Sequence, residues 1–138
     1  MTEPKRIWWA RPRKLCALER PGGGGRSHRP ERREAEIEYL KENGVRAVIS
    51  LMKSRHNFDA YEAAGIEAIH LPVEQDEEGL LEAVAVVKRE TRKRGAVAIH
   101  DNRYTDFVAA ICAYHLFEQR GTPIEESLEA AAEAGLAV

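Results

Sequence analysis

Hydrophobic and polar positions along the chain fall into blocks that predict strands and helices in turn. Two short apolar segments come first, at 6–10 and 14–18, separated by an Arg-Pro pair. The segments 45–51, 66–71 and 96–99 have the apolar, β-branched character of buried strands. Helical patterns cover 31–42, 58–64, 78–94, 105–119 and 123–134. Strands separated by helices of this length predict a single three-layer α/β domain, in which helices flank a mostly parallel sheet of four or five strands.

One segment interrupts this alternation. The residues from Pro21 to Pro30 include four consecutive glycines, which regular secondary structure accommodates only at an entropic cost. We therefore expect one domain over residues 1–138, with a Gly/Arg-rich loop at 21–33. The basic side chains of this segment are Arg26, His28, Arg29, Arg32 and Arg33. They can reach a phosphate or an RNA backbone, or they can form a solvated surface, which is the commoner case.

Composition narrows the class of protein. The 138 residues suffice for one core, and the hydrophobic content of 43% is typical of globular chains. No apolar run approaches the ~20 residues of a membrane span, and the first residues lack the apolar core of a signal peptide. We expect a cytoplasmic protein without a membrane partner. Cys16 and Cys112 have no metal-type spacing and suit a reducing compartment. The charged content of 32% hints at a thermophile source.

The charge is unevenly distributed, although the net charge is only -2. Residues 1–35 hold ten Lys and Arg against four Glu, whereas the remainder holds eleven against nineteen acidic residues. A basic first quarter is suited to phosphates. The partners that we expect are a phosphorylated ligand or a protein. Nucleic acid is less favoured, and the basic 26–33 segment leaves it open.

The candidate site follows the last predicted strand. Ligands of parallel sheets bind beyond the carboxyl ends of the strands, at helix N-termini. The segment in this position is HDNRYTDF, residues 100–107. The functional question therefore concerns the chemistry of these eight side chains.

The chain resembles the dual-specificity branch of the protein tyrosine phosphatases, particularly its small archaeal-type members. The resemblance rests on WARPRKLCA (9–17), LKENGVRAVISL (40–51), GIEAIHLPV (65–73) and the turn at 100–107, which follow one another at matching spacing. In that family, the last motif reads His-Cys, five residues, then Arg and Ser or Thr. The resemblance implies a cysteine-phosphatase fold over nearly the whole chain.

The signature of this family has a clear physical logic. Backbone N–H groups of the loop and the following helix N-terminus hold the phosphate oxygens. Their positive field lowers the pKa of the cysteine, so that a thiolate attacks phosphorus. The arginine binds two phosphate oxygens as a fork, and a carboxylic acid from another loop protonates the leaving oxygen.

This sequence departs from the signature at its main positions. His100 matches the signature histidine, but Asp101 stands at the position of the cysteine and Phe107 at that of the arginine. Tyr104 replaces the usual glycine. The family's acid segment is also altered, because Asp76 comes one residue late. Two unit charges 4 Å apart interact by about 4 kcal/mol at an effective dielectric of 20, so a carboxylate in this loop repels phosphate.

The resemblance and these departures together define the candidate residues. The candidate catalytic residues are His100, Asp101 and Asp76. The candidate ligand-binding residues are Asp101, Asn102, Arg103, Tyr104, Thr105, Asp106 and Phe107. We expect no cofactor and no metal site. The first hypothesis is a pseudophosphatase, a catalytically degenerate phosphatase domain with an anion-binding or regulatory role.

Two alternatives remain open. The first is a diverged phosphoester hydrolase, in which a metal ion assists Asp101 and His100 together with Asp106 and His70. The second is a structural or interaction protein with a vestigial pocket. Cysteine-dependent phosphatase activity is not expected under any of these hypotheses, so whether the protein is an enzyme at all stays undecided by the sequence.

Overall fold

The computed structural model describes residues 3–138 and contains one five-stranded sheet. The strands are β1 (Ile7–Arg11), β2 (Leu15–Glu19), β3 (Val45–Ser50), β4 (Glu67–His70) and β5 (Ala96–Asp101), in the order β1-β2-β5-β3-β4. β1 runs antiparallel to β2, and all other neighbours are parallel. The predicted α/β class and the mostly parallel sheet are thus confirmed.

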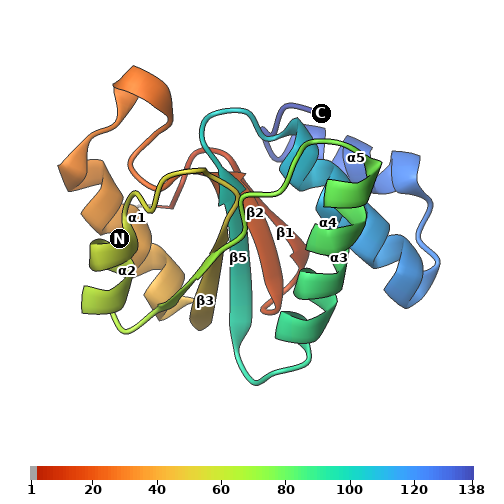
Figure 1. The fold of residues 1–138 in the computed structure, drawn as a ribbon, viewed down its shortest axis with the longest axis horizontal. Helices are drawn as coiled ribbons and strands as arrows, with labels where there is room; N and C mark the ends of the chain where they lie inside the picture. Colours follow the sequence, from red (N-terminus) through yellow and green to blue (C-terminus); the bar gives the residue numbers. More distant parts are fainter. Residues whose placement is uncertain (1–2) are drawn as a thin grey trace.

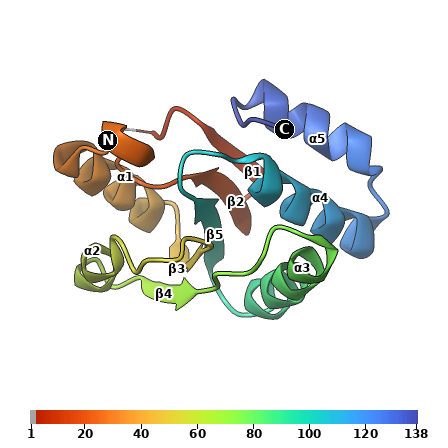
Figure 2. The ribbon, with the colours of Figure 1, turned by 45° about the horizontal axis from the view of Figure 1, so that its top comes forward.

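Helices cover both faces of the sheet (Figures 1 and 2). They are α1 (Pro30–Glu42) and α2 (Phe58–Ala63) on one face, and α3 (Glu77–Thr91), α4 (Asp106–Arg120) and α5 (Ile124–Glu133) on the other; a short 3₁₀ turn, η1, spans Gly25–Ser27. Within the described residues, no helix combines the length and the apolar character that crossing a membrane requires.

The central strand β5 explains why the sheet needs helices on both sides. Val97 and Ile99 pack into the core beneath α3, α4 and α5, whereas Ala96 and Ala98 pack into the core beneath α1 and α2. Successive side chains of a strand point to opposite faces, so an apolar residue at every position requires two cores. The continuous apolar run in the sequence is the local cause of the three-layer arrangement.

Two predicted boundaries were wrong in informative ways. The Gly/Arg-rich loop was expected at 21–33 but ends at Arg29, because Pro30 occupies the first turn of α1, where its missing N–H costs nothing. β5 was expected to end at Ile99 but continues to Asp101, because His100 and Asp101 stay in register with β2. The predicted nucleophile position is therefore the last residue of a strand.

Candidate functional site

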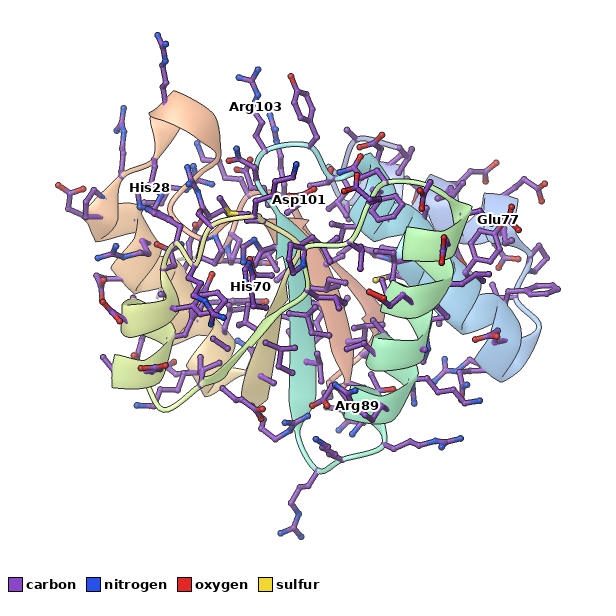
Figure 3. All side chains as sticks on the ribbon, viewed as in Figure 1. His28, His70, Glu77, Arg89, Asp101 and Arg103 are labelled. Atoms are coloured by element: carbon purple, nitrogen blue, oxygen red, sulfur yellow. The ribbon has the colours of Figure 1, made fainter. Side chains whose placement is uncertain are left out.

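The candidate site lies at the edge of the sheet where the four parallel strands end, which is the upper edge in Figure 1. Two adjoining hollows of about 560 and 460 Å³ open there. Both are lined by Gln75, Asp101 and Asn102. The first extends toward Lys53 and Glu74, and the second toward residues 104, 106 and 138. Asp101 therefore lines both hollows, and Figure 3 shows where it lies at the top of the sheet.

The carboxylate of Asp101 is held by neutral groups alone. Its Oδ1 accepts the backbone N–H of Asn102 at 2.8 Å, and its Oδ2 accepts Nε2 of Gln75 at 3.0 Å. Within residues 3–138, no basic side chain forms an ion pair with it. Burial and the nearby charge of Asp106 raise the pKa of Asp101. The two hydrogen bonds lower it, but by less, so the pKa lies above its usual value. The loop thus carries a partly desolvated negative charge at its centre.

His100 is buried and serves the architecture of the loop. Its Nδ1 lies 2.8 Å from the backbone oxygen of Asp101, and its Nε2 lies 3.1 Å from the hydroxyl of Tyr61. The arrangement fits an Nδ1–H that donates to the carbonyl and an Nε2 that accepts from tyrosine. Burial lowers the pKa of His100 to about 4, so the ring is neutral at pH 7. His100 fixes the turn after β5 and does not face the cavity.

The metal ligands of the alternative hydrolase hypothesis do not come together in the described part of the chain. His70 donates Nε2 to the backbone oxygen of Met52 at 2.8 Å, and His100 is turned toward Tyr61. Across residues 3–138, no three His, Cys, Asp or Glu side chains are arranged to hold an ion. Asp101 and Asp106 are the two members of the set that approach one another, since both line the second hollow.

Asn102 joins the candidate loop to the Gly-rich segment. Its Oδ1 accepts the N–H of Gly25 at 2.8 Å, and its backbone oxygen accepts the N–H of Arg20 at 3.0 Å. The backbone of Gly24 packs directly against Arg103, and a β-carbon on Gly24 would overlap with it. Glycine at this position is therefore required by close approach, since its φ of -88° is open to any residue.

Two of the candidate ligand-binding side chains, Thr105 and Phe107, point elsewhere, and a third, Tyr104, lines the second hollow from an exposed position. The hydroxyl of Thr105 accepts the backbone N–H of Ala137 at 2.7 Å and is buried, so it holds the C-terminal segment. Phe107 packs against the core beneath α4. Tyr104 is 62% exposed, with its ring under the guanidinium of Arg103. The first turn of α4 consequently offers no guanidinium to the cavity.

The predicted acid, Asp76, has a structural role. Its carboxylate accepts the N–H of Gly79 at 2.8 Å and caps the start of α3. Gly79 lets the preceding loop pack tightly, because a β-carbon there would overlap with the backbone oxygen of Glu74. This packing brings Gln75 rather than Asp76 to Asp101. A neutral amide therefore occupies the side of the cavity where the family's acid was expected.

The sequence analysis missed four residues that shape the site. Gln75 bonds to Asp101, Tyr61 bonds to His100, Arg20 bonds to the Gly-rich loop, and His56 bonds to Arg20. Gln75 lies next to Asp76 in a segment that had already been singled out, so it had a signal. The partners of Tyr61 and His56 are far away in the sequence, and no local pattern indicates the contacts of Arg20 with nearby glycines.

Solved structures include close matches to this fold. P. aeruginosa TpbA, solved in complex with pTyr, has a TM-score of 0.74 at 15% identity, and the match covers 99% of this chain and 79% of that one. A phosphatase candidate of the DUF442 group from Shewanella putrefaciens CN-32 has a TM-score of 0.68 at 19% identity, over 98% and 84%. Human DUSP28 has a TM-score of 0.65 at 19% identity, over 97% and 85%. The sequence itself matches no family model and no curated protein.

These similarities identify the architecture. The chain has a dual-specificity and tyrosine phosphatase-like fold, as the resemblance in its motifs implied. At identities of 15–20%, the likeness concerns the fold, and the chemistry has to be argued from the side chains of this chain.

Proposed function

We propose that this protein is a pseudophosphatase, a phosphatase-fold domain that binds a phosphorylated ligand or a protein partner without cysteine-dependent turnover. The observation that carries this proposal is the environment of Asp101. Its carboxylate takes up the N–H of Asn102, a donor of the kind that the family offers to phosphate. A second anion in the same loop would meet both Asp101 and Asp106.

The first turn of α4 supports the same conclusion. Phosphoryl transfer depends on positive groups that stabilise the charge of the transferring phosphoryl group. Here the position of the family's arginine carries Phe107, which packs into the core, and the helix begins with the acidic Asp106. The candidate loop carries no cysteine, and the family's arginine position carries no guanidinium.

The proposal includes binding because the fold retains an open cavity at the usual edge of the sheet. A fold neighbour, TpbA, was solved in complex with pTyr, which makes phosphorylated ligands the natural class to test. We also assign the protein to the cytoplasm, and its two free, buried cysteines, Cys16 and Cys112, are compatible with that compartment.

The decisive experiment is a p-nitrophenyl phosphate assay of four proteins. Wild type, Asp101→Cys and Phe107→Arg should show no turnover above buffer, because each lacks the thiolate, the arginine or both. Only the double variant Asp101→Cys/Phe107→Arg restores both groups, and any recovered activity should be confined to it. Circular dichroism checks that the two variants with the Phe107→Arg change are folded. Clear turnover by wild type or by Asp101→Cys would overturn the proposal.

The metal-assisted hydrolase is tested in the same assay. Addition of Mg²⁺ or Mn²⁺ should leave the wild type inactive. The ring nitrogens of His70 and His100 that could bind a metal are hydrogen-bonded to the backbone of Met52 and Asp101 and to the hydroxyl of Tyr61. A divalent-dependent turnover that Asp101→Asn abolishes would establish the alternative instead.

A further inference from the structure

A group of basic side chains lies beside the candidate loop, and no function has yet been assigned to it. It comprises Arg20, His28, His56 and Arg103, which we call the Gly-loop cluster. Arg20 follows β2 directly and is only 7% exposed. Its guanidinium donates Nε to the backbone oxygen of Gly23 at 3.0 Å and Nη2 to that of Gly25 at 2.9 Å. Its Nη1 lies 3.4 Å from Nδ1 of His56.

Arg103 approaches the same turn. A β-carbon on Gly25 would lie 3.6 Å from Cδ and 3.8 Å from Nη1 of Arg103, so both arginines come close to this one glycine. Among the described residues, the side chain of Arg103 bonds to the hydroxyl of Tyr104 alone, at 2.9 Å. Figure 3 shows Arg103 above Asp101, and His28 on the neighbouring Gly-rich segment.

Neither arginine has a carboxylate partner within the described residues. The nearest candidate, Glu19, is already paired with Arg32 at 3.0 Å and Arg6 at 4.0 Å. A guanidinium has five N–H donors, and Arg20 uses three of them on two carbonyls and one ring. A buried cation that lacks a counterion is costly, and an anion supplied by a ligand relieves that cost.

Two histidines, His28 and His56, lie beside Arg20. Their rings meet edge to face, with centroids 4.6 Å apart. Burial and the charges of Arg20 and Arg33 lower the pKa of both His28 and His56, so the rings stay neutral near pH 7. Nδ1 of His56 accepts from Arg20, so its Nε2 carries the proton and can donate to an oxyanion. Nδ1 of His28 donates to the backbone oxygen of Gly23, which leaves its Nε2 as an acceptor.

We propose that the Gly-loop cluster binds a phosphate dianion, with Arg20 and Arg103, which both lie close to Gly25, as its main ligands. The anion is then held beside the Gly-rich loop, with Arg103 reaching it from the loop at 101–107, and not on the backbone N–H groups of that loop. The inference deepens the proposed function, on which its biological meaning rests. This location has a physical cause. Asp101 and Asp106 repel an anion from the backbone of the loop at 101–107, whereas the neighbouring guanidinium groups, which have no carboxylate partner, attract one.

The test is a titration of ¹⁵N-labelled full-length protein with inorganic phosphate and, separately, with phenyl phosphate, followed by backbone amide shifts. Saturable shifts should centre on residues 22–25, 56 and 103. Tighter binding of phenyl phosphate would assign the site to a phosphate ester, and equal binding to free phosphate. Saturable shifts centred on 102 and 104–106, or no saturation with either probe, would overturn the inference.

Three variants sharpen the result. Arg103→Gln should weaken phosphate binding about tenfold, because it removes one charged hydrogen-bond donor without touching the buried core. Arg94→Gln makes the same change of charge at an exposed position after α3 and should change the affinity less than twofold. Asp101→Asn should also change it less than twofold, whereas clear tightening would place the anion in the original loop.

The outcomes separate this inference from the proposed function. Turnover of p-nitrophenyl phosphate tests catalysis, whereas the titration tests the location of the anion. Binding centred on 102 and 104–106 without turnover overturns the site at the Gly-rich loop and leaves the pseudophosphatase intact.

Discussion

The two ends of the parallel strands, at the top and the bottom of Figure 1, differ in how their charged side chains are paired. At the end of the sheet where Figure 3 labels Arg89, Glu90 is 1% exposed and its carboxylate meets three cations: Arg46 at 3.1 Å, Arg89 at 2.9 Å and Lys93 at 3.0 Å. At the upper edge, Asp101 has no cation and Arg20 has no carboxylate among the described residues. The two ends of the sheet therefore differ in whether their charged side chains have an oppositely charged partner.

The pKa values of the two carboxylates express this difference. Burial alone raises the pKa of Glu90, but the hydrogen bonds from Arg89, Lys93 and Arg46 outweigh it and lower the value to about 2. Burial also raises the pKa of Asp101, and only neutral donors oppose it. A compensated charge stabilises the fold, whereas an uncompensated charge at a cavity is tolerated where a ligand is to be bound. The comparison thus distinguishes the end of the sheet near Glu90, where charges stabilise the fold, from the end near Asp101, where we propose that a ligand binds.

The largest predicted effect is a loss of stability in acid that begins at the upper edge. The pKa of His100 is about 4 in the folded protein and about 6.5 in an unfolded chain, so the unfolded state binds more protons between these values. Its contribution is complete above pH 6.5 and is lost as the pH falls toward 4, amounting to about 3 kcal/mol. Burial likewise lowers the pKa of His115 to about 4, so urea unfolding from pH 7 to pH 4 measures the loss from both histidines, and the same titration of His115→Gln isolates that of His100.

Glu90 should act in a different pH window. Its pKa of about 2 lies below the usual 4.5, so its contribution is present above pH 4.5 and is lost as the pH falls toward 2. The variant Glu90→Gln should therefore keep the decline between pH 6.5 and 4 and lose the further decline below it. A single decline confined to pH below 4.5 would contradict the role given to His100.

The next effect contrasts neutralisation at the two edges. Glu90→Gln should lower the free energy of unfolding by about 2 kcal/mol at pH 7, because three cations lose their shared anion, although two of them are largely exposed. Asp101→Asn should change it by less than about 1 kcal/mol, in the stabilising direction, since asparagine keeps a partner for Asn102 and Gln75. Equal destabilisation by both variants would remove the distinction between the edges.

The smallest effect concerns the contact between the two upper loops. Gly24→Ala should cost about 1 kcal/mol, because its β-carbon overlaps with Arg103, and the loops must separate. The amide of Gly25, which donates to Asn102, should then exchange faster with solvent. Gly44→Ala is the matched control, since its cost comes from a φ of 81° alone, with open space around the position. Unchanged exchange at Gly25 in the first variant would show that the loops are independent.

The fold could be predicted from the sequence because its signals are local. The apolar run of β5 demands helices on both faces, and Asn43-Gly44 ends α1 with a glycine at positive φ. The sequence also predicted which catalytic groups the loop lacks, because Asp101 and Phe107 replace the cysteine and the arginine that the family's reaction needs. The role of each candidate was less accessible. Asp76 and Thr105 are polar residues in the right segments, yet each bonds to backbone groups that the sequence does not place near them.

The sequence by itself determined the layers, the strand that leads into the site, and the absence of a cysteine and an arginine from the cysteine and arginine positions of the family's loop. Only the tertiary structure decided which charges are paired. Arg20 and Arg103 are 83 positions apart and lie close to the same glycine, whereas Glu90 pairs with cations from β3 and from its own helix. Pairing depends on distances of a few ångströms between distant segments, and residue periodicity carries no information about such distances.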